Sequence, residues 1–194
     1  MIIVTEHESM EPLNHIGTEP IVTERLTLRR FVIDDYKDMF TFTSNPEVVK
    51  YLSYKPHESP EHTRALLENW VKGYKSNQTY NWAIECEGKL VGSISVVEID
   101  NRCFSCHLGW QLNIPYWNKG IMTEAAKAVV DYLFNKVCFD RISSGCDERN
   151  IGSYRVMEKI GMKHEGTLRR FYHQKDGSIG DKRLYAILKE EWLK

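Results

Sequence analysis

The segment from Leu108 to Ala128 constrains the fold of this chain most, because its hydrophobic spacing changes from two residues to nearly four. Before Pro115, apolar and polar side chains alternate, which is the pattern of a half-buried β-strand. The alternating residues are Phe104, Cys106, Leu108, Trp110 and Leu112. From Ile121, apolar residues follow a helical repeat. They form two neighbouring stripes, Ile121, Ala125, Val129, Leu133 and Val137 beside Met122, Ala126, Val130 and Phe134. The pattern predicts a strand, a tight loop around Gly120 and a helix.

The loop around Gly120 meets the physical requirements of an anion site. The first turn of the following helix has N–H groups without intrahelical partners and the positive end of the helix dipole. Gly120 lets the backbone approach an anion closely, and Thr123 adds a hydroxyl donor. These features favour a phosphate or pyrophosphate. A plain strand–helix connection, in which Gly120 only makes the turn, fits the same residues.

Composition excludes several classes of protein. The chain has 194 residues, a net charge of −1, 42% hydrophobic residues and 27% charged residues, so a single soluble domain is expected. No global basic field favours nucleic acid or an anionic membrane. Apolar runs are shorter than the roughly 20 residues of a membrane span, and the start of the chain does not resemble a signal peptide. We expect a cytoplasmic protein with neither a nucleic-acid nor a membrane partner.

The five cysteines do not predict a metal site. Cys103 and Cys106 have the spacing of half a zinc knuckle, but no second pair completes it. Free thiols in a reducing compartment are expected instead.

Periodicity elsewhere predicts an α/β chain with a mixed sheet of about seven strands and helices on both faces. Strands are expected at 21–31, 82–86, 90–99, 104–112 and 141–147, with two more around a turn at Lys175–Gly177. Helices are expected at 34–43, 60–76, 121–137 and 150–160. Ser44, Asn45 and Pro46 should end the first of them. Residues 1–20 are interpreted as a loosely held arm, and residues 21–194 as one domain.

The run Y-W-N-K-G-I-M-T-E-A, from Tyr116 to Ala125, resembles the acyl-CoA pyrophosphate loop of the GNAT N-acetyltransferase superfamily, R/Q-x-x-G-x-G/A. The most similar branch is the RimJ/RimL type, the ribosomal-protein-alanine acetyltransferases, whose loop reads like Y-W-G-K-G-x-x-T-E-A. Gly120 matches the strictest position. The departures from the superfamily pattern are Trp117, Asn118 and Met122. The predicted order of elements also matches the superfamily from Ile21 to Trp192.

A second run, from Asn150 to Met162, is similar to the family element N-x-x-S-x-x-V-x-x-K-x-G-F. Its residues also fit a simple helix, with Asn150 as N-cap and Gly161 just past the end. The resemblance implies that Asn150 contacts the pantetheine arm and that Ser153 protonates the departing CoA thiolate. For Lys159, a solvated helix lysine is the alternative to a ligand contact.

The resemblance implies a sheet that splays between the fourth and fifth strands, with acetyl-CoA as cosubstrate. It implies that the backbone near Leu112 supplies an oxyanion donor. The implied cofactor-binding residues are Leu112, Asn118, Lys119, Gly120, Ile121, Met122, Thr123, Asn150, Ser153 and Lys159.

The proposed general base follows from one substitution. Relatives commonly read E-I-G-Y in the fourth strand, whereas this chain reads His107-Leu108-Gly109-Trp110. A neutral imidazole can accept the amine proton. His107 is therefore the candidate base and Ser153 the candidate acid, with a surface histidine as the alternative. Tyr172 and His173 are secondary candidates to line the acceptor cleft.

The expected function is transfer of an acetyl group to a primary amine. An α-amine has a pKa of roughly 7.7–8 against roughly 10.4 for a lysine-type amine, which favours a peptide or protein N-terminus. Small-molecule amines (polyamines, amino sugars, amino acids) and a non-catalytic acyl-CoA-binding module stay open. An unrelated nucleotide-binding protein is disfavoured, because G-x-x-x-x-G-K-S/T and G-x-G-x-x-G are absent. A homodimer is one assembly that we keep open.

Overall fold

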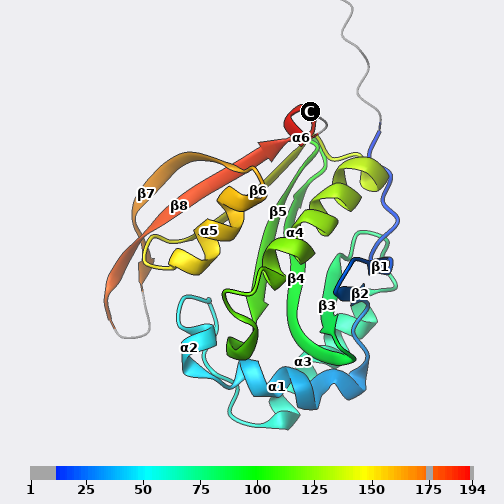
Figure 1. The fold of residues 1–194 in the computed structure, drawn as a ribbon, viewed down its shortest axis with the longest axis vertical. Helices are drawn as coiled ribbons and strands as arrows, with labels where there is room; N and C mark the ends of the chain where they lie inside the picture. The colour runs from blue at the N-terminus through cyan, green and yellow to red at the C-terminus, as the bar shows by residue number, and fades with distance from the viewer. Residues whose placement is uncertain (1–11, 174–176, 193–194) are drawn as a thin grey trace, which may run out of the picture.

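An eight-stranded mixed β-sheet organises the computed structural model, which describes residues 12–173 and 177–192 (Figure 1). The strands lie in the order β1-β2-β3-β4-β5-β6-β8-β7. They are β1 (Ile21–Val22), β2 (Leu26–Arg29), β3 (Asn81–Cys86), β4 (Lys89–Asp100), β5 (Ser105–Leu112), β6 (Arg141–Asp147), β7 (Lys163–His173) and β8 (Ile179–Leu188). Among the described strands, β5 and β6 are the neighbours that run parallel, and the other neighbouring pairs are antiparallel. The predicted mixed α/β sheet is confirmed.

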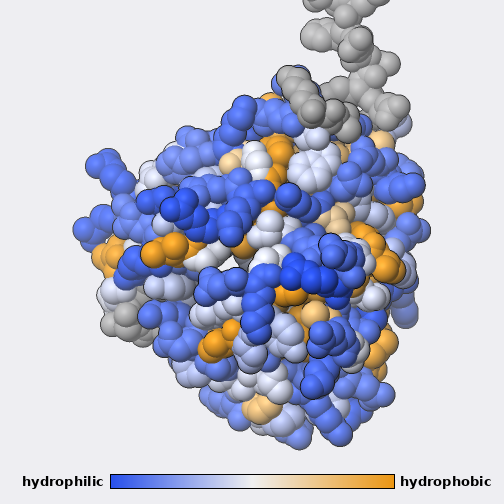
Figure 2. Space-filling view, in the orientation of Figure 1, coloured by the Kyte–Doolittle hydropathy of each residue, from blue (hydrophilic) through white to orange (hydrophobic). Residues whose placement is uncertain are grey.

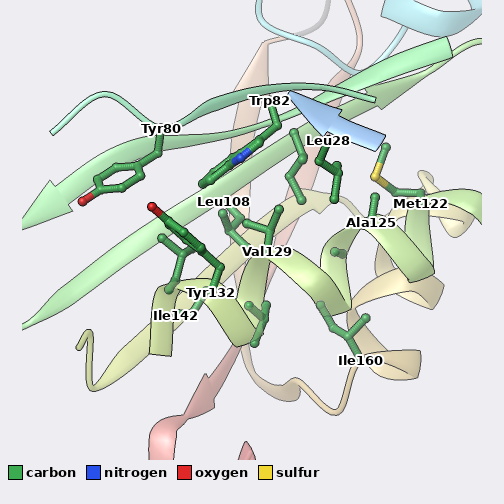
Figure 3. Packing of buried hydrophobic residues seen from close by; sticks show 14 of the residues in the cluster. Leu28, Tyr80, Trp82, Leu108, Met122, Ala125, Val129, Tyr132, Ile142 and Ile160 are labelled. Carbon is green, nitrogen blue, oxygen red and sulfur yellow. The ribbon is translucent and has the colours of Figure 1, made fainter. Parts of the chain in front are cut away.

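Helices cover both faces of the sheet, as expected. They are α1 (Tyr36–Thr43), α2 (Pro46–Val49), α3 (Pro60–Gly73), α4 (Ile121–Tyr132), α5 (Ile151–Lys159) and α6 (Lys189–Trp192). Strand β3 serves two cores, because successive side chains point to opposite faces. Trp82 and Ile84 join the cluster that contains α4 and α5, whereas Ala83 joins the smaller cluster with α1 and α3. Figure 3 shows Trp82 and Leu28 of the sheet facing Val129 of α4.

The predicted helix at 121–137 forms in two parts. α4 continues directly into a π-helical segment, Leu133–Val137, and Cys138 ends it with a φ of +69°. Every residue of the stripe from Ile121 to Val137 is buried, so the periodicity identified the core face correctly.

The prediction of a single strand at 21–31 is wrong, because the chain folds back within it. The backbone N–H of Thr23 donates to the carbonyl of Leu26 over 2.9 Å, and Ile21 pairs antiparallel with Leu28. β1 and β2 are therefore a short hairpin, which gives the sheet one strand more than expected. Arg25 lies in its turn.

The region between the first two predicted helices contains an additional helix. Asn45 was expected only to help end α1, but its side chain accepts a hydrogen bond from the Glu47 N–H and caps α2, with Pro46 in the first turn. The N-cap predicted at Ser59 is confirmed, and α3 ends at Gly73, slightly before the predicted end.

The described part of the expected N-terminal arm, residues 12–20, is held against the domain. The Tyr132 hydroxyl donates to the carbonyl of Gly17 over 2.6 Å, and the Trp82 indole N–H donates to that of Glu19 over 2.8 Å. Both donors belong to the main core. This segment is therefore bound rather than loose, and the rest of the arm lies outside the described residues.

Figure 2 shows that the face seen in Figure 1 is covered largely by hydrophilic residues, with hydrophobic residues in small separate groups. β7 and β8 form a hairpin at one edge of the sheet, and the turn predicted at Lys175–Gly177 lies partly outside the described residues. No helix in the described part of the chain is long and apolar enough to cross a membrane.

Candidate active site

The sheet opens between β5 and β6 (Figure 1). These strands pair from Ser105 with Arg141 as far as Leu108 with Ser144, and β5 then continues without a partner in β6. The hydroxyl of Ser144 donates to the Leu108 carbonyl over 2.9 Å where the pairing stops. The predicted splay between these strands is confirmed, and the chain enters α4 and α5 from its open end.

A backbone N–H of β5 is directed into this opening. Asn113 N–H donates to the carbonyl of Val91 on β4 over 2.8 Å, whereas Leu112 lies opposite Gly92. Bonded and non-bonded pairs alternate along antiparallel strands, so the Leu112 N–H points away from β4. The Leu112 carbonyl accepts a 2.7 Å hydrogen bond from the indole N–H of Trp117. Leu112 thus has the orientation that an oxyanion donor needs.

Glycines stand on both sides of the opening on the sheet face opposite α4. A Cβ atom added to Gly145 of β6 would lie 2.6 Å from Cε of Lys182. One added to Gly109 of β5 would lie 3.2 Å from a methyl of Val97. The Lys182 and Val97 side chains therefore occupy the space beside these two positions, and a larger residue than glycine would crowd them.

The segment predicted to bind a phosphate, called the phosphate loop below, lies at the start of α4. Asn118 and Gly120 have φ angles of +58° and +76°, which turn the chain sharply into the helix. The side chains of Ile121 and Met122 are buried in the core, so these residues present only their backbone N–H groups. Lys119 lies between the two left-handed residues. The six predicted loop residues therefore lie together at one helix N-terminus.

A cavity of about 450 Å³ adjoins this loop. Its lining residues are Thr23, Glu24, Gly120, Thr123, Glu124, Lys127 and Lys159. Gly120, Thr123 and Lys159 were among the predicted ligands. Sequence reasoning missed Lys127, although its position one turn after Thr123 on the same helix was a usable signal. Two lysines on different helices give the cavity a cationic side.

Arg25 ties the β1–β2 turn to the loop. Its guanidinium Nη1 donates to the Lys119 carbonyl over 2.9 Å, and its Nε donates to Glu124 Oε2 over 2.6 Å. The Thr23 hydroxyl and the Arg25 backbone N–H donate to the other carboxylate oxygen at 2.6 and 2.9 Å. Burial alone would raise the pKa of Glu124. The hydrogen bonds from Thr23 and Arg25 together outweigh that effect, so the pKa of Glu124 lies below its ordinary value.

Asn150 and Ser153 lie at the other helix start beside the opening. The Asn150 side-chain oxygen caps α5 by accepting from the Ser153 N–H over 3.2 Å, which leaves its amide NH₂ to donate elsewhere. Cys146 of β6 is next to both residues. Burial raises the pKa of its thiol to about 11, although the Ser153 side chain lowers it in part. The thiol is therefore neutral at physiological pH.

His107 lies one residue before the point where β5 and β6 separate. Its Nδ1 is 2.9 Å from the Ser143 hydroxyl oxygen, and that hydroxyl donates to the carbonyl of Cys106 over 3.1 Å. Ser143 has one hydroxyl proton, so Nδ1 must carry the imidazole proton, and Nε2 is left as the acceptor. Burial, followed by Lys182, lowers the pKa of His107, against a smaller opposing effect of Glu98.

His107 lines a second, polar cavity of about 190 Å³. The other lining residues are Glu98, Asp100, Ser105, Cys106 and Ser143. Tyr172 and His173, the secondary candidates, line neither cavity and pair with Gly180 and Ile179 in the hairpin.

Sequence reasoning missed a hydrogen-bonded group at β5 that consists of Tyr54, Gln111 and Ser93. Gln111, on the same face of β5 as His107, accepts a hydrogen bond from the Tyr54 hydroxyl and donates to the Ser93 hydroxyl over 3.0 Å. Burial raises the pKa of Tyr54, so its hydroxyl stays protonated. No sequence pattern links Tyr54 to β5, because the contact is long-range.

This arrangement defines the class of protein. An opening with a directed backbone N–H, a helix N-terminus at its end and a neutral histidine beside it provides the parts that acyl transfer from a phosphate-bearing thioester needs. In residues 12–173 and 177–192, no group of three or more His, Cys, Asp or Glu side chains is placed to hold a metal ion.

Comparison with known proteins identifies the family. The family model described as "Acetyltransferase (GNAT) domain" matches residues 25–163, so the chain belongs to the GNAT acetyltransferases and is an acyltransferase of the N-acetyltransferase type. It is 35% identical to the uncharacterized N-acetyltransferase YnaD of Bacillus subtilis over 175 residues. The aligned residues make up 89% of this chain and 98% of that protein. A GNAT-family acetyltransferase structure from Bacillus anthracis superimposes with a TM-score of 0.79 at 33% identity, over 89% of this chain and 100% of that chain.

More distant proteins have named acceptors. The spermidine N(1)-acetyltransferase of Escherichia coli is 23% identical over 73% of this chain and 74% of its own length. RimL, a ribosomal-protein α-N-acetyltransferase solved in complex with coenzyme A, has the same fold, with a TM-score of 0.79 over 88% of this chain and 98% of that chain at 19% identity. The GNAT membership expected from the loop is thus confirmed, and the likeness to RimL is one of fold. GNAT acetyltransferases use acetyl-CoA, whereas their acceptors differ.

Proposed function

We propose that this protein transfers the acetyl group of acetyl-CoA to the α-amine of a peptide or protein N-terminus. The observation that carries the proposal is the neutral His107, whose Nε2 is left as a proton acceptor by the bond from Nδ1 to Ser143. Deprotonating a lysine-type amine costs roughly 3.5 kcal/mol more than deprotonating an α-amine. A histidine whose pKa lies below its ordinary value is a weak base, and it suits the more acidic α-amine.

The side chains divide the chemistry among them. Bound acetyl-CoA supplies the thioester whose carbonyl carbon the amine attacks. His107 takes the amine proton, directly or through a water in the polar cavity, as the C–N bond forms. The Leu112 N–H stabilises the developing oxyanion, and Ser153 gives a proton to the sulfur as the C–S bond breaks. Each step uses a group at or beside the opening.

The loop residues account for binding of the nucleotide end. The N–H groups of Gly120, Ile121, Met122 and Thr123 face an anion with the positive end of the α4 dipole behind them. Lys127 and Lys159 add cationic charge to the adjoining cavity. Asn150 has its amide NH₂ available for the pantetheine arm. These residues fit a ligand with a pyrophosphate and a long neutral arm.

A polyamine is the second candidate acceptor, because Glu98 and Asp100 line the cavity that His107 shares. Carboxylates there would favour a polycation. A relative named as a spermidine acetyltransferase is compatible with this alternative.

The test is thiol release from acetyl-CoA with a panel of acceptors. Peptides with a free N-terminus should support turnover, whereas the same peptides with a blocked N-terminus and an internal lysine should not. Faster turnover with spermidine would favour the polyamine alternative. Binding of CoA without thiol release for any amine would identify a non-catalytic acyl-CoA-binding protein.

A further inference from the structure

Arg25 and Glu124 form the only described ion pair that joins the β1–β2 turn to the first turn of α4. The side chain of Glu124 is 18% exposed and that of Arg25 is 44% exposed, so the carboxylate is largely covered while the guanidinium stays accessible. Both residues lie at the loop where the cofactor is proposed to bind. The pair was invisible in the sequence, where its members stand far apart.

The carboxylate of Glu124 presents an electrostatic problem at this position. A negative charge in the first turn stabilises a helix, but it also repels an anion that binds the same turn. Glu124 lines the cavity together with Gly120 and Thr123. Arg25 and Thr23 together supply donors to both carboxylate oxygens, so the β1–β2 turn balances the charge of Glu124.

The second contact of Arg25 controls the direction of one peptide group. The carbonyl of Lys119 accepts from Arg25 Nη1. In a planar trans peptide the carbonyl and the following N–H point in opposite directions. The Gly120 N–H is therefore held pointing away from Arg25. Gly120 has a left-handed φ of +76°, and the closest atom to a Cβ added there would be Arg25 Nη2 at 3.4 Å.

We infer that Arg25 is a positioning residue for the pyrophosphate of acetyl-CoA: it neutralises Glu124 and aims the Gly120 N–H at the ligand. This inference rests on the proposed cofactor site. Arg25 acts on the nucleotide end of the cosubstrate and takes no part in the acyl transfer itself. Its loss should raise KM for acetyl-CoA while kcat at saturation changes little.

The experiment compares wild type with Arg25→Gln, Glu124→Gln and the double variant, using CoA binding by calorimetry and steady-state kinetics. Arg25→Gln should weaken CoA binding by about 10- to 100-fold, with kcat within about threefold of wild type. In the double variant the unbalanced carboxylate is also removed. CoA affinity should therefore recover by at least about threefold relative to Arg25→Gln alone.

S-acetylpantetheine separates positioning from general damage, because it carries the thioester but lacks the pyrophosphate. Its kcat/KM should be the same in wild type and Arg25→Gln. Arg64→Gln is the matched control, since Arg64 forms an exposed ion pair with Glu68 on α3, away from the loop. That variant should bind CoA like wild type.

Three results would overturn the inference. One is wild-type CoA affinity in Arg25→Gln, and another is a double variant that binds CoA no better than Arg25→Gln. The third is an equal loss of activity with S-acetylpantetheine and acetyl-CoA, which would assign Arg25 a purely structural role. If wild-type protein binds no CoA, the proposed cofactor site itself is wrong. If wild type binds CoA but one of these three results is obtained, only the role of Arg25 is wrong, so the two failures are distinguishable.

Discussion

Ser144 donates a hydrogen bond to the carbonyl of Leu108 at the last pair of residues that joins β5 to β6. The Ser144 side chain is buried, so this bond gives its hydroxyl a partner where water does not reach it. The bond thus lies at the point where the pairing of the two strands stops.

Ser144→Ala should destabilise the protein by about 0.5–1.5 kcal/mol, because it removes a buried hydrogen bond to the Leu108 carbonyl. Urea denaturation would measure the loss in free energy of unfolding. Ser143→Ala serves as the control: Ser143 is less buried and its loss should alter the His107 tautomer more than stability. A Ser144→Ala protein as stable as wild type would mean that water takes the place of the hydroxyl.

Gly120→Val should abolish CoA binding. CoA at 100 times its dissociation constant should stabilise the wild-type fold by about 2.7 kcal/mol, and this shift should be lost in the variant. The matched control is Gly88→Val in the β3–β4 turn, where φ is +74° and nothing lies within 4 Å of an added Cβ. Both variants carry left-handed strain, but only the loop variant should lose the ligand shift. A shift retained in Gly120→Val would contradict the assigned anion site.

Asn150→Ala should weaken CoA binding and also cost about 1 kcal/mol of stability, because it removes the cap of α5. Ser59→Ala removes the cap of α3 in the same way, so it should lower stability without any change in CoA affinity. Equal CoA affinity in the two variants would leave Asn150 with a capping role alone.

Ser153→Ala should lower kcat with acetyl-CoA affinity unchanged, because the acid that assists thiolate departure is lost. Single-turnover and steady-state rates on one peptide acceptor would show the effect. A normal kcat in this variant would mean that water or another group protonates the sulfur.

His107→Gln should lower the rate by at least about 10² at neutral pH, and His107→Glu should retain more activity because it restores a base. The pKa of His107 lies below its ordinary value of 6.5, so the base is available at neutral pH and the rate should fall on the acid side. This acid limb should flatten in His107→Gln once the ionisation of the acceptor is subtracted.

The same pKa shift predicts an effect on stability. The pKa of His107 is lower in the folded state than in the unfolded state, so around and below pH 6.5 the unfolded state binds more protons than the folded state. The free energy of unfolding therefore decreases as the pH falls through this range. The free energy of unfolding should therefore depend less on pH in His107→Gln below that value. Equal rates for wild type and His107→Gln near neutral pH would make His107 a residue without a catalytic role.

Local spacing predicted much of the fold and the loop, because each depends on residues near one another in sequence. The stripe from Ile121 to Val137 and the alternation along β5 identified the core faces. The fold-back at Thr23 was missed, since its hydrogen bond to Leu26 interrupts an alternation that looks continuous. Arg25 and Tyr54 were missed because their partners, Glu124 and Gln111, are brought close only by the packed sheet.

The hydrogen bond from Trp117 to the Leu112 carbonyl joins the phosphate loop to the strand that is proposed to activate the thioester. The indole is 40% exposed, so solvent reaches one side of it while its N–H stays bound to the backbone. Indole emission responds to both solvent access and hydrogen bonding. One of the chain's five tryptophans therefore lies at the junction of its two proposed binding elements, and occupancy of the loop should change the emission of this indole without a label.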